Sequence, residues 1–165
     1  MIWCVLNGEL MPLSEARISP MDRGFLFGDG VYEVLACING RMRAPALHRK
    51  RLLESLSAIR LSVDVDQIFA DMMRVLKRSA LMNAKIYLQI TRGASDVRSH
   101  TFPKEVKPTC FITAMPFEFA KLEPAKAIVR EDIRWRKNKI KSISLLANVL
   151  LLQEAKEAEA EEVIL

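Results

Sequence analysis

Three lysines occupy alternate positions of one short segment, Lys137, Lys139 and Lys141. The charged residues around them alternate as in an extended strand, and an apolar helical pattern follows from about Ile143. A lysine at such a junction has a fixed backbone while its amine reaches into a cleft. Because an amine attacks a carbonyl only when unprotonated, a catalytic lysine also needs burial or neighbouring cations. The spacing by itself is more typical of a solvated cationic strand face.

Two pairs of Arg and His could bind anions. His48 and Arg51 are three residues apart in a predicted helix, 47–59, near the end that offers unpaired N–H groups to a phosphate. A capping or surface pair is an equally good interpretation. Arg98 and His100 are two residues apart in a predicted loop, so both could point to one side and hold a carboxylate. Most such loop pairs are solvated.

The segment 22–30 contains three glycines, which indicate tight turns or a close approach of the backbone to another group. It lacks the spacing of a phosphate-binding loop and leads into a predicted strand, 31–38, so structural turns are the favoured interpretation. Tyr32 lies in that strand. A buried core tyrosine and a ligand-facing one remain equally open there.

The elements that must position these residues follow from periodicity. Asn7-Gly8 predicts a type I′ hairpin turn, and Asn39-Gly40 predicts a second hairpin turn. Strands are expected at 2–6, 10–11, 31–38, 41–43, 86–91, 109–115 and 127–133. Helices are expected at 47–59, burying Leu52, Leu53, Leu56 and Ile59; at 66–81, burying Ile68, Met72, Val75 and Leu76; and from about 143 to about 160. A last strand begins near 162.

This order of elements predicts an α+β fold in two parts. Residues 1–120 form a small α+β domain, residues 121–126 read as a linker with a proline and several charges, and residues 127–165 start a second domain. A strand and one strongly apolar helix need more sheet than residues 127–165 supply. The second domain is therefore expected to be incomplete in this chain.

Composition narrows the function classes. The net charge is +5, but Lys and Arg are interleaved with Asp and Glu and form no basic block, which favours anionic small ligands over nucleic acid. The three cysteines are far apart and read as reduced core thiols, and with only two histidines no metal site is predicted. No signal peptide and no membrane span are recognised, so we expect a cytoplasmic protein.

Four stretches in this order resemble the fold-type IV (class IV) pyridoxal-phosphate enzymes. They are DRGFLFGDGVYEV (22–34), the helix with His48 and Arg51, YLQITRGASDVRSHTFP (87–103) and DIRWRKNKIKSISLLANVLLLQEA (132–155). The family includes D-amino acid transaminases, branched-chain aminotransferases and aminodeoxychorismate lyase. The resemblance covers nearly the whole chain and is strongest to the D-amino acid branch, through the R-x-H loop before Phe-Pro.

The resemblance implies a role for each candidate residue. Lys141, followed by Ser and the apolar helix, would be the Schiff-base lysine that binds pyridoxal 5′-phosphate, and Arg51 would bind its phosphate. Tyr32 and Val34 would line the substrate pocket, and the pair Arg98 and His100 would hold the substrate carboxylate across a homodimer interface. The implied reaction is transamination between a D-alanine-like D-amino acid and a 2-oxo acid.

The resemblance also implies that the chain lacks most of the larger C-terminal domain, including the acidic residue that pairs with the cofactor's ring nitrogen. The implied architecture is the N-terminal α/β domain of a class IV aminotransferase plus the first strand and helix of the next. The isolated chain is then expected to be weakly active or inactive. Branched-chain aminotransferase or lyase chemistry on the same fold, and a non-catalytic remnant, remain the alternatives.

Overall fold

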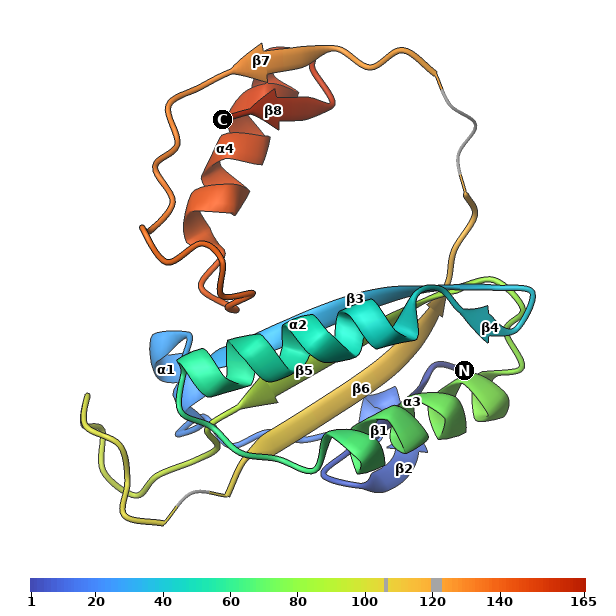
Figure 1. Cartoon of the computed structure of the whole chain (residues 1–165), viewed down its shortest axis with the longest axis vertical. Coiled ribbons are helices and arrows are strands. Elements are labelled where there is room, and N and C mark those ends of the chain that lie inside the picture. The colour runs from blue at the N-terminus through green and yellow to red at the C-terminus, as the bar shows by residue number, and fades with distance from the viewer. Residues whose placement is uncertain (106, 120–122) are drawn as a thin grey trace. The chain divides into compact units, whose positions relative to one another are not determined.

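The computed structural model describes residues 1–105, 107–119 and 123–165, and the chain divides into two compact units (Figure 1). The first unit comprises Met1–Glu118 together with Lys139–Ile143, and the second comprises Phe119–Asn138 and Ser144–Leu165. The mixed helix and strand content confirms the predicted α+β class. Positions 121 and 122 of the predicted linker lie outside the described residues.

The first unit is built on an antiparallel sheet of six strands in the order β2-β1-β6-β5-β3-β4. The strands are β1 (Trp3–Leu6), β2 (Glu9–Pro12), β3 (Gly30–Ile38), β4 (Arg41–Met42), β5 (Ala84–Thr91) and β6 (Thr109–Pro116). Both predicted hairpins are present. Their turn residues have positive φ angles, 53° and 85° at Asn7-Gly8 and 51° and 73° at Asn39-Gly40, as a type I′ turn requires.

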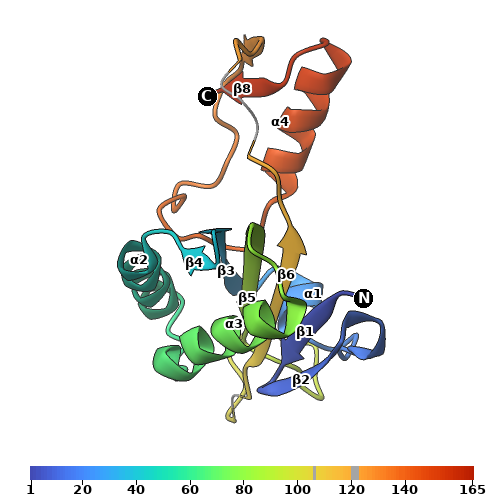
Figure 2. The same ribbon diagram turned by 90° about the vertical axis from the view of Figure 1, so that its right-hand side faces the viewer.

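Two helices, α2 (Pro45–Ala58) and α3 (Val65–Ser79), pack on one face of this sheet (Figures 1 and 2). Helix α2 lies on β3, and α3 lies on β1 and β6. Alternate residues of the strands, such as Ile86, Leu88 and Ile90, meet the helices in one apolar core. Because α2 and α3 lie on the same side, neither of them covers the opposite face of the sheet.

The buried face of α2 differs from the predicted one. Leu52 and Leu56 are buried as expected, but Leu53 is 43% exposed and Ser55 takes an inward position. The four residues predicted for α3 are all buried. The prediction of a purely apolar buried face was wrong for α2. This helix also packs against polar groups, the Glu33 carboxylate of β3 and the Lys141 N–H.

The glycine-rich segment contains a short helix that the turn interpretation missed. Helix α1 (Arg23–Phe27) begins at Asp22, whose side chain accepts a hydrogen bond from the Gly24 N–H, and ends at Gly28 with a left-handed φ of 68°. A 3₁₀ turn, η1 (Leu13–Glu15), precedes it. The predicted close approach is real at Gly24, where a Cβ would collide with the Thr91 side chain.

The second unit contains two parallel strands, β7 (Ala127–Val129) and β8 (Glu162–Ile164), joined through α4 (Leu146–Glu157). Helix α4 buries Leu151 and Ala155 and exposes several apolar side chains, Leu146, Val149, Leu150 and Leu152. None of the described helices is long and apolar enough to cross a bilayer.

The predicted strand 127–133 and its alternating continuation to Lys141 are wrong beyond Val129. The Arg134 side chain turns back to the Asp132 carboxylate two residues earlier, with two donor–acceptor distances of 2.8 Å, and residues 136–139 form a turn. This local ion pair and turn replace the expected cross-strand hydrogen bonds. Lys137 and Lys139 are consequently exposed turn residues.

Candidate active site

Lys141 is held at the edge of β3. The Tyr32 N–H donates to the Lys141 carbonyl at 3.0 Å, and the Ile143 N–H donates to the Gly30 carbonyl at 3.1 Å. The Lys141 N–H donates to the buried Ser55 hydroxyl of α2 at 3.2 Å. The sequence pattern predicts that this lysine ends a strand directly before a helix, and that prediction is wrong. Lys141 lies in an extended segment fixed by β3 and α2, and this pairing delays the start of α4 to Leu146.

Gly30 makes that pairing possible. A Cβ at this position would lie 2.5 Å from the Ile90 carbonyl oxygen and 2.9 Å from the Ile143 side chain. Only a residue without a side chain leaves room between β5 on one side and the Lys141 segment on the other.

The Lys141 side chain lies on the face of β3 that is turned away from α2. Its Nζ atom is 4.1 Å from the centre of the Tyr32 ring. Strand alternation puts Tyr32 and Val34 on this face, whereas Glu33 points to α2. The Tyr32 ring is 6.1 Å from the ring of Tyr87, whose hydroxyl donates to another side chain of β5 on the same face. Tyr32 is thus a partly exposed side chain on the face of the sheet opposite the helices, not a core tyrosine.

A buried carboxylate on the other face of β3 binds two basic residues of α2, His48 and Arg51. Glu33 is 1% exposed and accepts two hydrogen bonds from the Arg51 guanidinium, at 2.7 Å and 2.6 Å. Its Oε2 atom is also 2.8 Å from Nδ1 of His48. Burial opposes ionisation of Glu33, but the hydrogen bonds from Arg51 and His48 outweigh it and hold the pKa of Glu33 below its ordinary value. The same hydrogen bond raises the pKa of Arg51.

Arg51 retains the capacity to bind an anion. Its Nε and Nη2 atoms donate to Glu33, and its side chain is still 46% exposed. Within the described residues, Nη1 makes no hydrogen bond to protein. Arg51 lies one helical turn before Ser55, whose hydroxyl accepts the hydrogen bond from the Lys141 N–H, so Arg51 lies near the Lys141 segment. An amine and a fixed guanidinium on neighbouring segments suit a ligand with a carbonyl and a phosphate.

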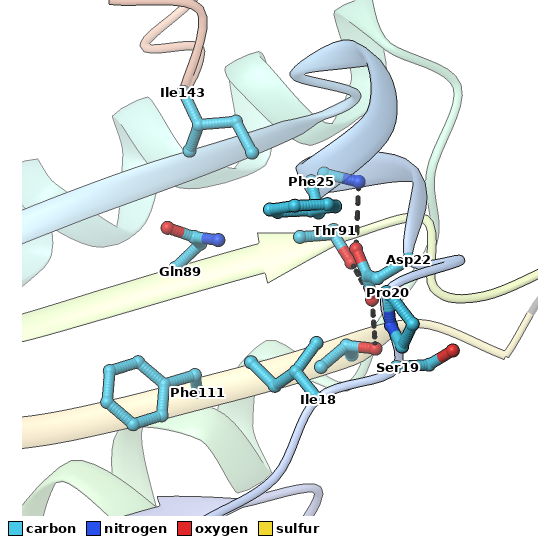
Figure 3. A pocket seen from close by; sticks show the side chains of 11 residues that line it. Ile18, Ser19, Pro20, Asp22, Phe25, Gln89, Thr91, Phe111 and Ile143 are labelled. Carbon is cyan, nitrogen blue, oxygen red and sulfur yellow. Dashed lines mark hydrogen bonds between the residues drawn. The ribbon is translucent and has the colours of Figure 1, made fainter.

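A pocket of about 460 Å³ opens on the sheet face opposite α2 and α3, beside the segment Lys141–Ile143 (Figure 3). Ile143 contributes one wall, and Phe25, Phe111 and Ile18 contribute apolar walls. At one end the Asp22 carboxylate accepts hydrogen bonds from the Gly24 N–H and from two threonine hydroxyls, Thr91 and Thr109. These contacts occupy both Asp22 oxygens, so Asp22 serves the structure of the pocket.

The loop with Arg98 and His100 lies against α1. The centre of the His100 ring is 5.2 Å from that of Phe27, and the Arg98 guanidinium carbon is 4.9 Å from the same ring. Both side chains are otherwise exposed. The structure therefore brings Lys141 to Tyr32 on one face of β3 and holds Arg51 against Glu33 on the other, one helical turn from the Ser55 that binds the Lys141 N–H. Arg98 and His100 have a separate support on α1.

Sequence reasoning missed Glu33, Ser55 and Arg23. Glu33 carried a usable signal, because strand alternation puts it on the same face as the apolar residues Val31 and Leu35. A carboxylate on a core face needs cationic partners, and His48 and Arg51 are the nearest pair in a covering helix. Ser55 carried no comparable signal.

Comparison with known proteins gives one consistent family. The sequence model of the family described as amino-transferase class IV matches residues 30–165. A D-alanine aminotransferase from Staphylococcus epidermidis is 36% identical over 165 residues, covering 96% of this chain and 58% of the relative. The chain thus spans little more than half of the length of that relative.

Solved structures agree at the level of the fold. A branched-chain aminotransferase from Thermoproteus uzoniensis, solved with norvaline, has a TM-score of 0.86 at 20% identity. The likeness covers 99% of this chain and 59% of the aminotransferase chain. The PLP-bound form of a hypothetical aminotransferase from Mycobacterium tuberculosis has a TM-score of 0.80 at 19% identity, covering 98% and 61%. Together with the family match over residues 30–165, these likenesses lead to one conclusion: the chain belongs to the class IV aminotransferase family.

Proposed function

We propose that the protein containing this chain transfers an amino group between a D-alanine-like D-amino acid and a 2-oxo acid, using pyridoxal phosphate held by Lys141. The observation that carries the proposal is the placement of the Lys141 amine over Tyr32, in a segment bound to α2 through Ser55, one helical turn after the half-exposed Arg51. The 36% identity to a D-alanine aminotransferase supports the substrate class.

Each residue of the site has a distinct task. The Lys141 amine would hold the cofactor covalently through Nζ, and Arg51 would bind the phosphate with the Nη1 edge that Glu33 leaves available. Pyridoxal phosphate, when bound, acts as the electron sink for the bond broken at the substrate's α-carbon. Tyr32 and Val34 would line the space for the substrate side chain.

Proton transfer falls to the same lysine. With pyridoxal phosphate bound, Lys141 Nζ would act as the general base that takes the proton from the substrate's α-carbon and then as the acid that gives the proton back. The Tyr32 ring, 4.1 Å away, limits the directions in which Nζ can approach. Arg98 and His100, supplied by a second copy in a homodimer, would hold the substrate carboxylate. The homodimer and the cytoplasmic location stay predictions from the sequence.

The test uses the purified full-length gene product and its Lys141→Ala variant, each incubated with pyridoxal phosphate and treated with borohydride. Reduction should leave the cofactor's mass on the peptide containing Lys141 in the wild type only. Amino transfer from D-alanine to 2-oxoglutarate should exceed transfer from L-leucine, and the variant should lose at least about 10²-fold in rate. Preference for L-leucine would instead support a branched-chain aminotransferase. Labelling at another lysine would contradict the assignment of Lys141.

A further inference from the structure

Arg23, in the glycine-rich segment, binds the backbone of the loop that carries Arg98 and His100. Its guanidinium donates through Nη1 to the carbonyl oxygens of Ser99, at 2.5 Å, and Thr101, at 3.2 Å. Nη2 donates to the His100 carbonyl at 3.4 Å. Three successive carbonyls of the loop thus converge on one side chain of a residue that is only 3% exposed.

A partly buried carboxylate orients that guanidinium. Asp29 accepts a hydrogen bond from Arg23 Nε at 2.8 Å and two from Arg92, at 2.8 Å and 3.0 Å. Burial disfavours the charged form of Asp29, but the hydrogen bonds from Arg92 and Arg23 prevail and lower its pKa. Arg92 is 1% exposed and also donates to the carbonyls of Ile59 and Arg60. Arg23, the clamp on the loop, is therefore connected through Asp29 and Arg92 to the end of α2 and to the core.

A single aromatic ring supports the side chains of the loop. Phe27 lies 4.9 Å from the guanidinium carbons of both Arg23 and Arg98, and its ring centre is 5.2 Å from that of His100. Further along, Phe102 lies 3.7 Å from the guanidinium carbon of Arg92. The backbone is held by Arg23 and the two donor side chains rest on Phe27, while Arg98 and His100 remain exposed to a ligand.

We propose that Arg23 and Phe27 are positioning residues for the substrate carboxylate, acting through Arg98 and His100. This inference rests on the proposed function. A loop fixed in advance loses less freedom when it binds, so its two donors bind a carboxylate more tightly than a mobile loop would. Asp22–Gly30 would then serve two active sites of the proposed homodimer: Gly30 admits the Lys141 segment of its own site, and Arg23 and Phe27 orient the carboxylate donors that the same chain offers to the partner's site.

The experiment compares Arg23→Lys and Phe27→Leu with wild type in the full-length protein. Arg23→Lys keeps the charge but loses the fork that reaches three carbonyls. Phe27→Leu keeps the guanidinium network and removes only the ring, so it serves if the first variant fails to fold. Arg17→Lys is the matched control, because Arg17 also donates to two backbone carbonyls, Ser14 and Ala16, but in an exposed turn.

Two readouts separate positioning from general damage. The first is single-turnover reaction with D-alanine and with ethylamine, an amine that lacks a carboxylate. The variants should raise the concentration of D-alanine needed for half-maximal rate by about 10- to 100-fold and leave the reaction with ethylamine within about twofold. The second is amide hydrogen exchange, which should accelerate at residues 98–101 and not in β5 or β6.

Each outcome has a defined meaning. Equal losses with both amines, or unchanged D-alanine dependence in both variants, would overturn the positioning role. If the wild type transfers no amino group at all, the proposed function fails, and unchanged exchange at residues 98–101 in Arg23→Lys would then separately overturn the clamp. Changes confined to D-alanine and to the loop, absent in Arg17→Lys, would support it.

Discussion

At the residue scale, Glu33 determines how Arg51 presents its guanidinium. The carboxylate is buried and holds Arg51 by two short hydrogen bonds, so the remaining Nη1 edge is fixed in direction before an anion arrives. Fixing a donor in advance lowers the entropic cost of binding. In the proposed function, Glu33 would thus contribute to anion binding without touching the anion.

The Glu33→Gln substitution tests this contribution. The amide that replaces the carboxylate would turn an N–H₂ group toward other donors, so one hydrogen bond to Arg51 or His48 is lost and the free energy of unfolding should fall by about 1–3 kcal/mol. The dissociation constant for pyridoxal phosphate, measured by titration, should rise by about tenfold, which corresponds to about 1.4 kcal/mol of binding free energy. Glu54→Gln, on the exposed side of the same helix, is the control. Unchanged or tighter cofactor binding in Glu33→Gln would contradict the role given to Glu33.

At the element scale, the regular parts of the first unit were predictable and the segment with the lysine was not. The hairpins at Asn7-Gly8 and Asn39-Gly40 and the buried face of α3 follow from local rules, because turn chemistry and periodicity act within a few residues. The course of Lys141–Ile143 depends on Gly30, which is distant in sequence. No local sequence pattern predicts the contact between Gly30 and this segment.

The role of Lys141 came from resemblance rather than from spacing. Lys137 and Lys139 share its alternation but lie in an exposed turn, and the three differ only in their contacts with β3 and α2. Glu33 could have been found from alternation. Arg23 could not, because three separate carbonyls of a distant loop define its task.

Gly30→Ala tests the pairing between β3 and the Lys141 segment. The new methyl group would meet the Ile90 carbonyl oxygen, which belongs to the rigid β3–β5 pair, so the Ile143 side must move. We expect a loss of about 1–3 kcal/mol in the free energy of unfolding, measured in denaturant. Borohydride trapping of the cofactor on Lys141 should also decrease.

Gly8→Ala separates steric exclusion from backbone strain. Gly8 has a φ of 85°, and a Cβ there would meet nothing within 4 Å. This variant should lose about 1 kcal/mol through its left-handed backbone and keep full trapping at Lys141. Equal trapping in the Gly30 and Gly8 variants would show that close approach at Gly30 is not required.

At the scale of the whole molecule, two arginine-bound acids with lowered pKa values, Asp29 and Glu33, predict sensitivity to acid. The pKa values of Asp29 and Glu33 lie below their ordinary values of 3.8 and 4.5. Above the ordinary values both acids are ionised in folded and unfolded chains, and their contribution to stability is complete. As the pH falls below them, the unfolded chain binds protons first, so the contribution is lost until the folded acids also protonate.

We predict that the free energy of unfolding is constant from about pH 7 to about pH 5 and declines steadily below the ordinary Glu pKa of 4.5. Urea unfolding at a series of pH values measures it. Glu33→Gln should have a shallower decline than wild type, because one of the two acids no longer titrates. Glu54→Gln, whose carboxylate is exposed, should follow the wild type. A decline of equal slope in Glu33→Gln and wild type would rule out Glu33 as its source.

The first unit is discontinuous in sequence, since Lys139–Ile143 joins it after the chain has passed through residues of the second. The hydrogen bonds between this late segment and β3 therefore close a very long loop, and contacts of that kind form late in folding. During synthesis the strands, α2 and Arg51 leave the ribosome well before Lys141 does. Covalent capture of the cofactor by this lysine would then report that the last strand-edge contact of the first unit has closed.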